Sequence, residues 1–81
     1  MTGPTRHVIP MPGLSEMDAG TIVEWRKATG DTVERGEIVA VVDADKVTLD
    51  VEAPATGRIE ITADEEAEVA VGEPIGWVTE Q

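Results

Sequence analysis

Valine and isoleucine dominate the apolar residues of this chain, which has 17 of them against only two leucines, Leu14 and Leu49. Side chains branched at Cβ are stiff, and they fit the pleated surface of a strand better than the surface of a helix. The chain has no phenylalanine and no tyrosine, so its only aromatic core candidates are Trp25 and Trp77. This composition predicts an all-β fold with a thin aliphatic core between sheets.

Short apolar runs separated by turn residues predict where the strands lie. We expect strands near residues 7–10, 21–26, 38–44, 47–53, 58–62 and 75–79, with a shorter strand around Val69. The segment from 62 to 68 has no apolar face and is predicted to be a loop. Many short strands with regular turns are typical of β-sandwiches and barrels.

The two halves of the sequence resemble each other. The run from Gly20 to Ile22 matches the run from Gly57 to Ile59, 37 positions further on, and Val33 and Val69 occupy matching places 36 positions apart. Two similar halves would build two similar sheets around a pseudo-two-fold axis, although chance similarity in a chain rich in valine and glycine is the alternative. We therefore expect a flattened β-barrel or sandwich of two small antiparallel sheets, a barrel-sandwich hybrid.

Glycines stand where the chain is expected to reverse, and each can supply a positive φ there: Gly30, Gly36, Gly57 and Gly72. Glu66 stands in the second half where Gly30 stands in the first. A non-glycine residue disfavours the left-handed region, so we expect that turn to be built differently, with Glu66 outside it.

The charge of the chain excludes several classes of function. It carries 17 Asp and Glu against six Lys and Arg, which argues against nucleic acid and anionic membrane surfaces as partners. It has no cysteine and a single histidine, His7, so neither a thiolate metal site nor a catalytic triad is credible. We therefore expect a non-catalytic domain, with a solvated acidic surface or electrostatic steering toward a basic partner.

Asp45 and Lys46 join the strands expected at 38–44 and 47–53, and two residues between two strands define a β-hairpin. Neither residue adopts a positive φ cheaply, so the pair is poor chemistry for the turns that hairpins favour. A break of local rules at an exposed point is where function is expected. On turn chemistry alone, an ordinary solvated lysine remains the alternative. The chain's other lysine, Lys27, is interpreted as a solvated loop charge.

From about residue 8 to 79, the sequence resembles the lipoyl domain of dihydrolipoamide acyltransferases, in the biotinyl/lipoyl attachment superfamily. The stretches that carry the resemblance are "MPGLSEMDAGTIVEW" at 11–25, "GDTVERGE" at 30–37, "DADKV" at 43–47, "APATGRI" at 53–59 and "VAVGEPI" at 69–75. In that family the lysine of an Asp-Lys pair at a hairpin tip carries lipoic acid in amide linkage. The resemblance therefore implies that Lys46 is the attachment site and that Asp45 and Val47 flank it for recognition.

The resemblance also implies a function and a set of partners. The domain would be a swinging-arm carrier that moves acyl groups and reducing equivalents within a 2-oxo acid dehydrogenase complex. Its partners would be a lipoate ligase or lipoyl transferase, a thiamine-diphosphate 2-oxo acid decarboxylase, an acyltransferase core and dihydrolipoamide dehydrogenase. The parent chain would be a dihydrolipoamide acyltransferase.

Two other functions remain open. Biotin carrier domains of biotin-dependent carboxylases share the "AP…G" turn, but their lysine lies between two methionines, and none of Met1, Met11 and Met17 is near Lys46. An unmodified interaction module is the second. Whichever function applies, we expect residues 1–6 to be a loose terminus and residues 7–80 to form one monomeric domain. No signal peptide or membrane segment is visible, which favours the cytoplasm, or the mitochondrial matrix in a eukaryote.

Overall fold

The computed structural model describes residues 5–13, 18–44 and 46–80, and every regular element among them is a strand. The strands are β1 (Arg6–Pro10), β2 (Ala19–Trp25), β3 (Thr32–Val33), β4 (Ile38–Ala44), β5 (Val47–Glu52), β6 (Gly57–Ile61), β7 (Glu68–Ala70) and β8 (Pro74–Thr79). The predicted all-β class is confirmed, and so are the loop between β6 and β7 and the strand around Val69. The two-residue strand β3 was not predicted, because so short a run carries no alternation.

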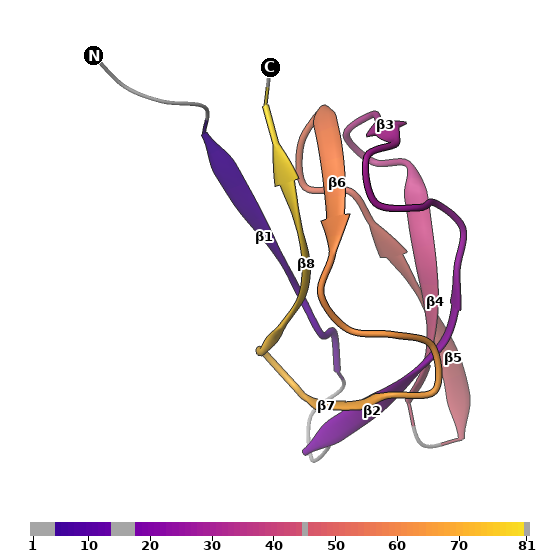
Figure 1. Ribbon diagram of the computed structural model, residues 1–81. Helices are drawn as coiled ribbons and strands as arrows, with labels where there is room; N and C mark the ends of the chain where they lie inside the picture. Colours follow the sequence, from indigo (N-terminus) through magenta and orange to yellow (C-terminus); the bar gives the residue numbers. More distant parts are fainter. Residues whose placement is uncertain (1–4, 14–17, 45, 81) are drawn as a thin grey trace.

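The strands form two four-stranded antiparallel sheets, with the orders β1-β8-β6-β3 and β5-β4-β2-β7 (Figure 1). The two orders correspond position by position, and the corresponding strands are four apart in the chain: β1 with β5, β8 with β4, β6 with β2 and β3 with β7. The two halves of the chain therefore contribute equivalent strands to opposite sheets. The predicted pseudo-two-fold arrangement is confirmed.

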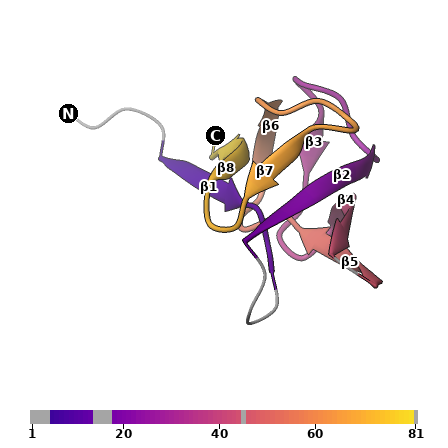
Figure 2. The same cartoon turned by 90° about the horizontal axis from the view of Figure 1, so that it is seen from below.

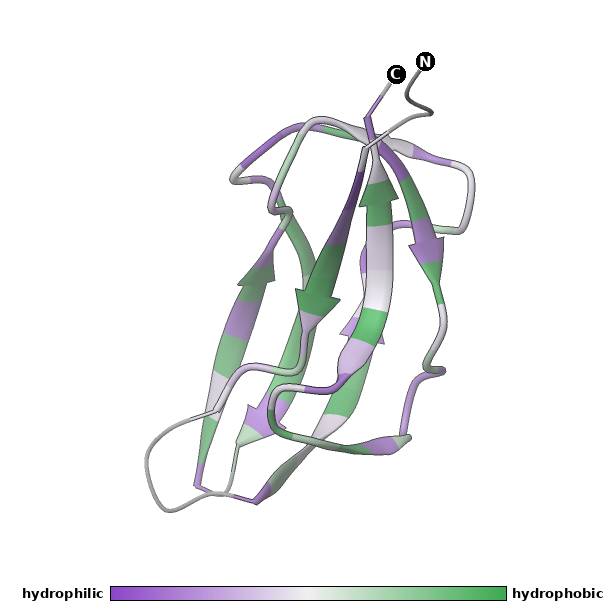
Figure 3. Ribbon diagram, turned by 90° about the vertical axis from the view of Figure 1, so that its left-hand side faces the viewer, coloured by the Kyte–Doolittle hydropathy of each residue, from purple (hydrophilic) through white to green (hydrophobic). Residues whose placement is uncertain are grey.

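The core between the sheets is aliphatic, as the composition predicts. Hydrophobic and hydrophilic residues alternate along the strands (Figure 3), and no polar or charged residue of the described segments is buried. The largest side chains that are almost wholly buried come from both sheets and, for Met11, from the segment after β1: Ile9, Met11, Ile22, Ile59, Ile75, Val33, Val39, Val42 and Val78. Burial of an isoleucine or valine side chain stabilises a fold by roughly 1.5–3 kcal/mol, so this small core depends on many such contacts.

Two turn predictions were wrong. Gly30, Gly36 and Gly72 have positive φ as expected, but Gly57 does not. Gly57 is required for another reason, because a Cβ atom there would lie 2.1 Å from the carbonyl oxygen of Thr79 on the neighbouring strand. Glu66, which we expected outside the left-handed region, lies within it at φ 72°. The Glu66 N–H donates to the Ile22 carbonyl at 2.7 Å, which ties this turn to β2 and supports its unusual conformation.

The lysine hairpin and the outer ends of β1 and β8 lie at opposite ends of the molecule (Figure 1). β1 begins at Arg6, inside the segment that we expected to be a loose terminus, and Arg6 pairs with Thr79 near the end of β8. The described residues contain no helical segment with the length and apolarity that a membrane crossing requires. The two sheets thus form a base from which the β4–β5 hairpin is presented away from the β1–β8 end.

Candidate functional site: the lysine hairpin

β4 and β5 are paired up to Ala44 and Val47, and Lys46 lies in the turn between the two strands. The pairing continues without a break from Ala44 back to Ala40, and the register shifts only at the far end of β4. Lys46 lies in this turn and is exposed. Asp45, the other predicted turn residue, lies outside the described residues. The predicted hairpin is therefore confirmed, with Lys46 at its tip.

The hairpin extends beyond the hydrophobic core at its tip. Along β5, Val47, Leu49 and Val51 alternate with three exposed polar residues, as predicted. Val47 is 46% exposed, Leu49 is half-buried and Val51 is 6% exposed, so burial increases with distance from the tip. On the opposite strand, Ala44 is 1% exposed and is the last buried residue before the turn. Figure 2 shows β4 and β5 side by side at the margin of the molecule.

The tip carries acidic neighbours, and no ion pair found among the described residues includes its lysine. Asp43 pairs in register with Thr48, and Asp50 with Val41, and both aspartates are exposed. Lys46 takes part in none of the ion pairs found among the described residues. An exposed amine without a partner in this part of the chain can be reached and bonded by an incoming group.

The other lysine is held very differently. Lys27 lies in the loop after β2, and its Nζ is 2.8 Å from the Oε2 atom of Glu37, in the turn before β4. The Oε1 atom of Glu37 accepts a hydrogen bond from the Glu34 N–H at 2.9 Å, so both carboxylate oxygens are engaged. Lys27 therefore lies in a loop, as interpreted, but its charge is only partly exposed and is paired with Glu37, which was not predicted. The sequence gives no local signal for this pair, because its members lie on either side of the short strand β3.

The ion pair shifts both ionisable groups away from their ordinary behaviour. The hydrogen bond to Glu37, and then the charge of its carboxylate, raise the pKa of Lys27 above 10.5. The hydrogen bond from Lys27, and then that from the Glu34 N–H, lower the pKa of Glu37 below 4.5. Lys27 is therefore a protonated amine held in an ion pair, whereas Lys46 takes part in no ion pair among the described residues.

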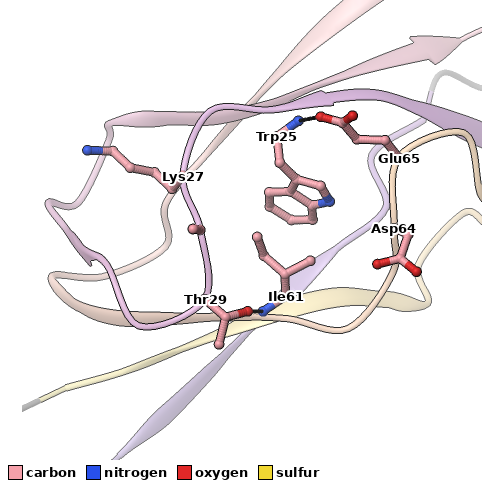
Figure 4. A pocket seen from close by; sticks show the side chains of 7 residues that line it. Trp25, Lys27, Thr29, Ile61, Asp64 and Glu65 are labelled. Carbon is pink, nitrogen blue, oxygen red and sulfur yellow. Dashed lines mark hydrogen bonds between the residues drawn. The ribbon is translucent and has the colours of Figure 1, made fainter.

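Of the two tryptophans, Trp25 packs against the edge of the core, as predicted. The indole Nε1–H of Trp25 donates to the Ala63 carbonyl at 2.8 Å, and the ring packs partly against the core. Trp25 and Ile61 also line an open hollow of about 590 Å³ between the loops that follow β2 and β6 (Figure 4). Trp77 lies on the opposite sheet, with the Arg6 guanidinium 4.5 Å from its ring centre. Trp25 pairs with Ala40, six positions before Lys46, and Lys46 is not among the residues that line this hollow.

Three comparisons relate this chain to known proteins. A family model described as "Biotin-requiring enzyme", for biotin and lipoyl attachment, matches residues 7–78. The succinyltransferase component of the 2-oxoglutarate dehydrogenase complex of Rickettsia conorii is 43% identical over 74 residues, which cover 90% of this chain and 18% of that protein. The acetyltransferase component of the pyruvate dehydrogenase complex of Corynebacterium glutamicum is 46% identical over 72 residues, covering 86% of this chain and 11% of that protein.

A solved structure matches nearly end to end. The lipoyl domain of the 2-oxoglutarate dehydrogenase complex of Azotobacter vinelandii shares 37% identity and superposes with a TM-score of 0.70, over 93% of this chain and 95% of that domain. The chain spans less than a fifth of the length of the two curated relatives, but almost the whole of the solved domain.

The fold and the hairpin define a class of protein, the small two-sheet domains that present a lysine on a β-turn. The chain belongs to the biotinyl/lipoyl attachment domain family, and its relatives within that family are lipoyl domains of 2-oxo acid dehydrogenase acyltransferases.

Proposed function

We propose that Lys46 carries lipoic acid in amide linkage and that this domain is the swinging-arm carrier of a 2-oxo acid dehydrogenase complex. The single observation that carries the proposal is the exposed lysine in the turn between β4 and β5. The chain that presents it matches a solved lipoyl domain over 95% of that domain's length. In this role the domain transfers acyl groups and reducing equivalents between the other components of the complex. It is a non-catalytic domain of a dihydrolipoamide acyltransferase.

The residues of the tip fit a covalently attached acid. Amide formation needs an amine that solvent and a ligase can reach, and Lys46 is exposed and outside every ion pair among the described residues. Lipoic acid supplies the redox-active sulfurs that a chain without cysteine lacks. Asp45 and Val47 flank the amine, and we assign to them its recognition by a lipoate ligase or lipoyl transferase.

The two sheets position and extend the arm. Cross-strand pairs hold the hairpin in one register from Ala40 to the turn, and the buried Ala44 fixes the base of the tip. Because the tip projects past the core, the arm can enter a partner's active site while the body of the domain stays outside. Tethering converts each encounter into an intramolecular one, with effective concentrations on the order of millimolar for suitable linkers.

The partners in this proposal are a thiamine-diphosphate 2-oxo acid decarboxylase, the acyltransferase core and dihydrolipoamide dehydrogenase. One curated relative is a succinyltransferase component and another an acetyltransferase component, so these relatives do not define one 2-oxo acid. We place the domain in the cytoplasm, or in the mitochondrial matrix of a eukaryote.

Biotin is the second candidate group, because the family model that matches the chain covers biotin attachment as well. The neighbours of Lys46 argue against it. Biotin carrier domains place their lysine between two methionines, whereas Asp45 and Val47 flank Lys46 here.

Parallel ligation reactions test the proposal. The purified domain is incubated with ATP and either a lipoate ligase with lipoate or a biotin ligase with biotin, and its intact mass is measured. We expect one lipoyl group per molecule in the first reaction, no gain in the second, and no gain in a Lys46→Arg variant. A biotin gain would overturn the proposal in favour of a biotin carrier, and no gain with either enzyme would favour an unmodified interaction module.

A further inference from the structure

The chain presents two lysine side chains to its surroundings, Lys27 and Lys46, and the structure holds them in opposite ways. Lys46 lies exposed at a turn, whereas the Lys27 side chain is 29% exposed and its Nζ is 2.8 Å from Glu37. Glu37 is itself fixed, since its second oxygen accepts from the Glu34 N–H. Figure 4 shows the Lys27 amine directed away from the hollow that Trp25 lines.

We infer that Glu37 is a specificity-determining residue that withholds Lys27 from acylation, so that Lys46 is the reactive lysine of the domain. The biological value of this rests on the proposed function, because a carrier of activated acyl groups exposes its own surface to them. The rate at which each of the two amines reacts can be measured with any acyl donor.

The chemistry that Glu37 prevents is ordinary aminolysis. A neutral lysine amine attacks the carbonyl carbon of a thioester or of an acyl adenylate, and an N–C bond forms. The C–S or C–O bond then breaks, the thiolate or AMP leaves, and the nitrogen loses a proton to water. Protonation of the amine removes the lone pair that this attack needs, and the ion pair with Glu37 favours the protonated form.

Two features of the pair strengthen this effect. Each unit by which a pKa rises lowers the free-amine fraction about tenfold at a fixed pH below it. The pair also links the loop after β2 to the turn before β4, so the amine is held by geometry as well as by charge. The four remaining cationic side chains are arginines, which stay protonated and resist acylation.

Site-resolved chemical labelling tests the inference without any ligase. The wild-type domain, Glu37→Gln and the control Glu68→Gln are treated with the N-hydroxysuccinimide ester of acetate over a range of pH. Peptide mass mapping then gives the labelling rate at each lysine. Glu68 is an exposed carboxylate on β7 that forms none of the ion pairs found in the described segments, so its variant removes the same charge at another place.

We expect Lys27 to react several-fold more slowly than Lys46 in the wild type. Glu37→Gln should raise the Lys27 rate several-fold and shift its pH profile toward lower pH, while leaving the Lys46 rate unchanged. Gln keeps a carbonyl oxygen for the Glu34 N–H, and a loosened turn alone would not shift the pH profile. Equal rates at the two lysines in the wild type, or a Lys27 rate that is unchanged in Glu37→Gln, would overturn the inference. Either result would leave the test of lipoylation at Lys46 unaffected.

Discussion

Gly57 shows how much one residue without a side chain can decide in this fold. It pairs with Val33 on β3, and its Cα faces the end of β8 so closely that a Cβ atom would lie 2.1 Å from the Thr79 oxygen and 2.7 Å from its carbonyl carbon. Both are backbone atoms, so no side-chain rotation can relieve the clash. The requirement is one of space and not of φ, and only the packed sheet reveals it.

We predict that Gly57→Ala destabilises the domain by about 2–3 kcal/mol, because overpacking must displace paired backbone. Gly30→Asn is the comparison, since Gly30 has φ +97° and a Cβ atom there would meet nothing within 4 Å, so this variant adds backbone strain, which Asn bears at lower cost than most residues, but no steric clash. Denaturant unfolding followed by Trp fluorescence gives both values. Equal losses of stability in the two variants would contradict the steric explanation.

At the scale of elements, the pair between Lys27 and Glu37 lies just beyond the end of the β2–β4 ladder, where the Arg26 N–H donates to the Val39 carbonyl at 2.8 Å. Its contribution to stability depends on pH in a defined way. The pKa of Glu37 is lowered in the folded state. Its contribution to the free energy of unfolding is therefore fully present above pH 4.5 and is lost as pH falls through the folded-state pKa. The pKa of Lys27 is raised in the folded state. Its contribution to the free energy of unfolding is therefore fully present below pH 10.5 and is lost as pH rises through the folded-state pKa.

We therefore predict that Glu37→Gln lowers the thermal midpoint of unfolding most between pH 4.5 and pH 10.5. The difference from wild type should shrink in acid and in strong base. The effect should be small because both side chains are partly exposed. Thermal unfolding followed by circular dichroism across the pH range measures it, with Glu68→Gln as the charge control. A constant difference from wild type at every pH would contradict the account.

Some elements of the fold can be predicted from local sequence patterns, and others cannot. The longer strands, the hairpin at Lys46 and the pairing of two similar halves follow from runs of Val and Ile and from repeated turns, all of which are local patterns. β3, the space around Gly57 and the partner of Lys27 depend on residues that are distant in the sequence. At Glu66 the tertiary contact with β2 outweighs the local preference for glycine, so a rule based on turn chemistry alone could not predict it.

At the scale of the whole molecule, the domain is an acidic body with a net charge of −11 and acidic residues beside its lysine hairpin. Asp43 and Asp50 are exposed on the two hairpin strands, and lipoylation of Lys46 would remove a positive charge between them. A decarboxylase with a basic channel mouth would then attract the tip by long-range electrostatics.

We predict that the rate of reductive acylation of the lipoylated domain falls as salt is raised from low concentration to about 0.5 M, because salt screens exposed charges. Asp43→Asn combined with Asp50→Asn should lower the rate at low salt and flatten this dependence. Steady-state acylation by the cognate decarboxylase provides the measurement. A wild-type rate that does not vary with salt would contradict electrostatic docking of the tip.

The central claim is one of placement, and a swap at the hairpin tip tests it most directly. A variant with Asp45→Lys and Lys46→Asp keeps the composition and net charge of the chain but moves the amine by one position along the turn. Wild type and variant are lipoylated by the same ligase under the same conditions, folding is checked by circular dichroism, and intact mass gives the modified fraction. The account predicts complete modification of the wild type and none of the folded variant, whereas efficient modification of the variant would contradict it.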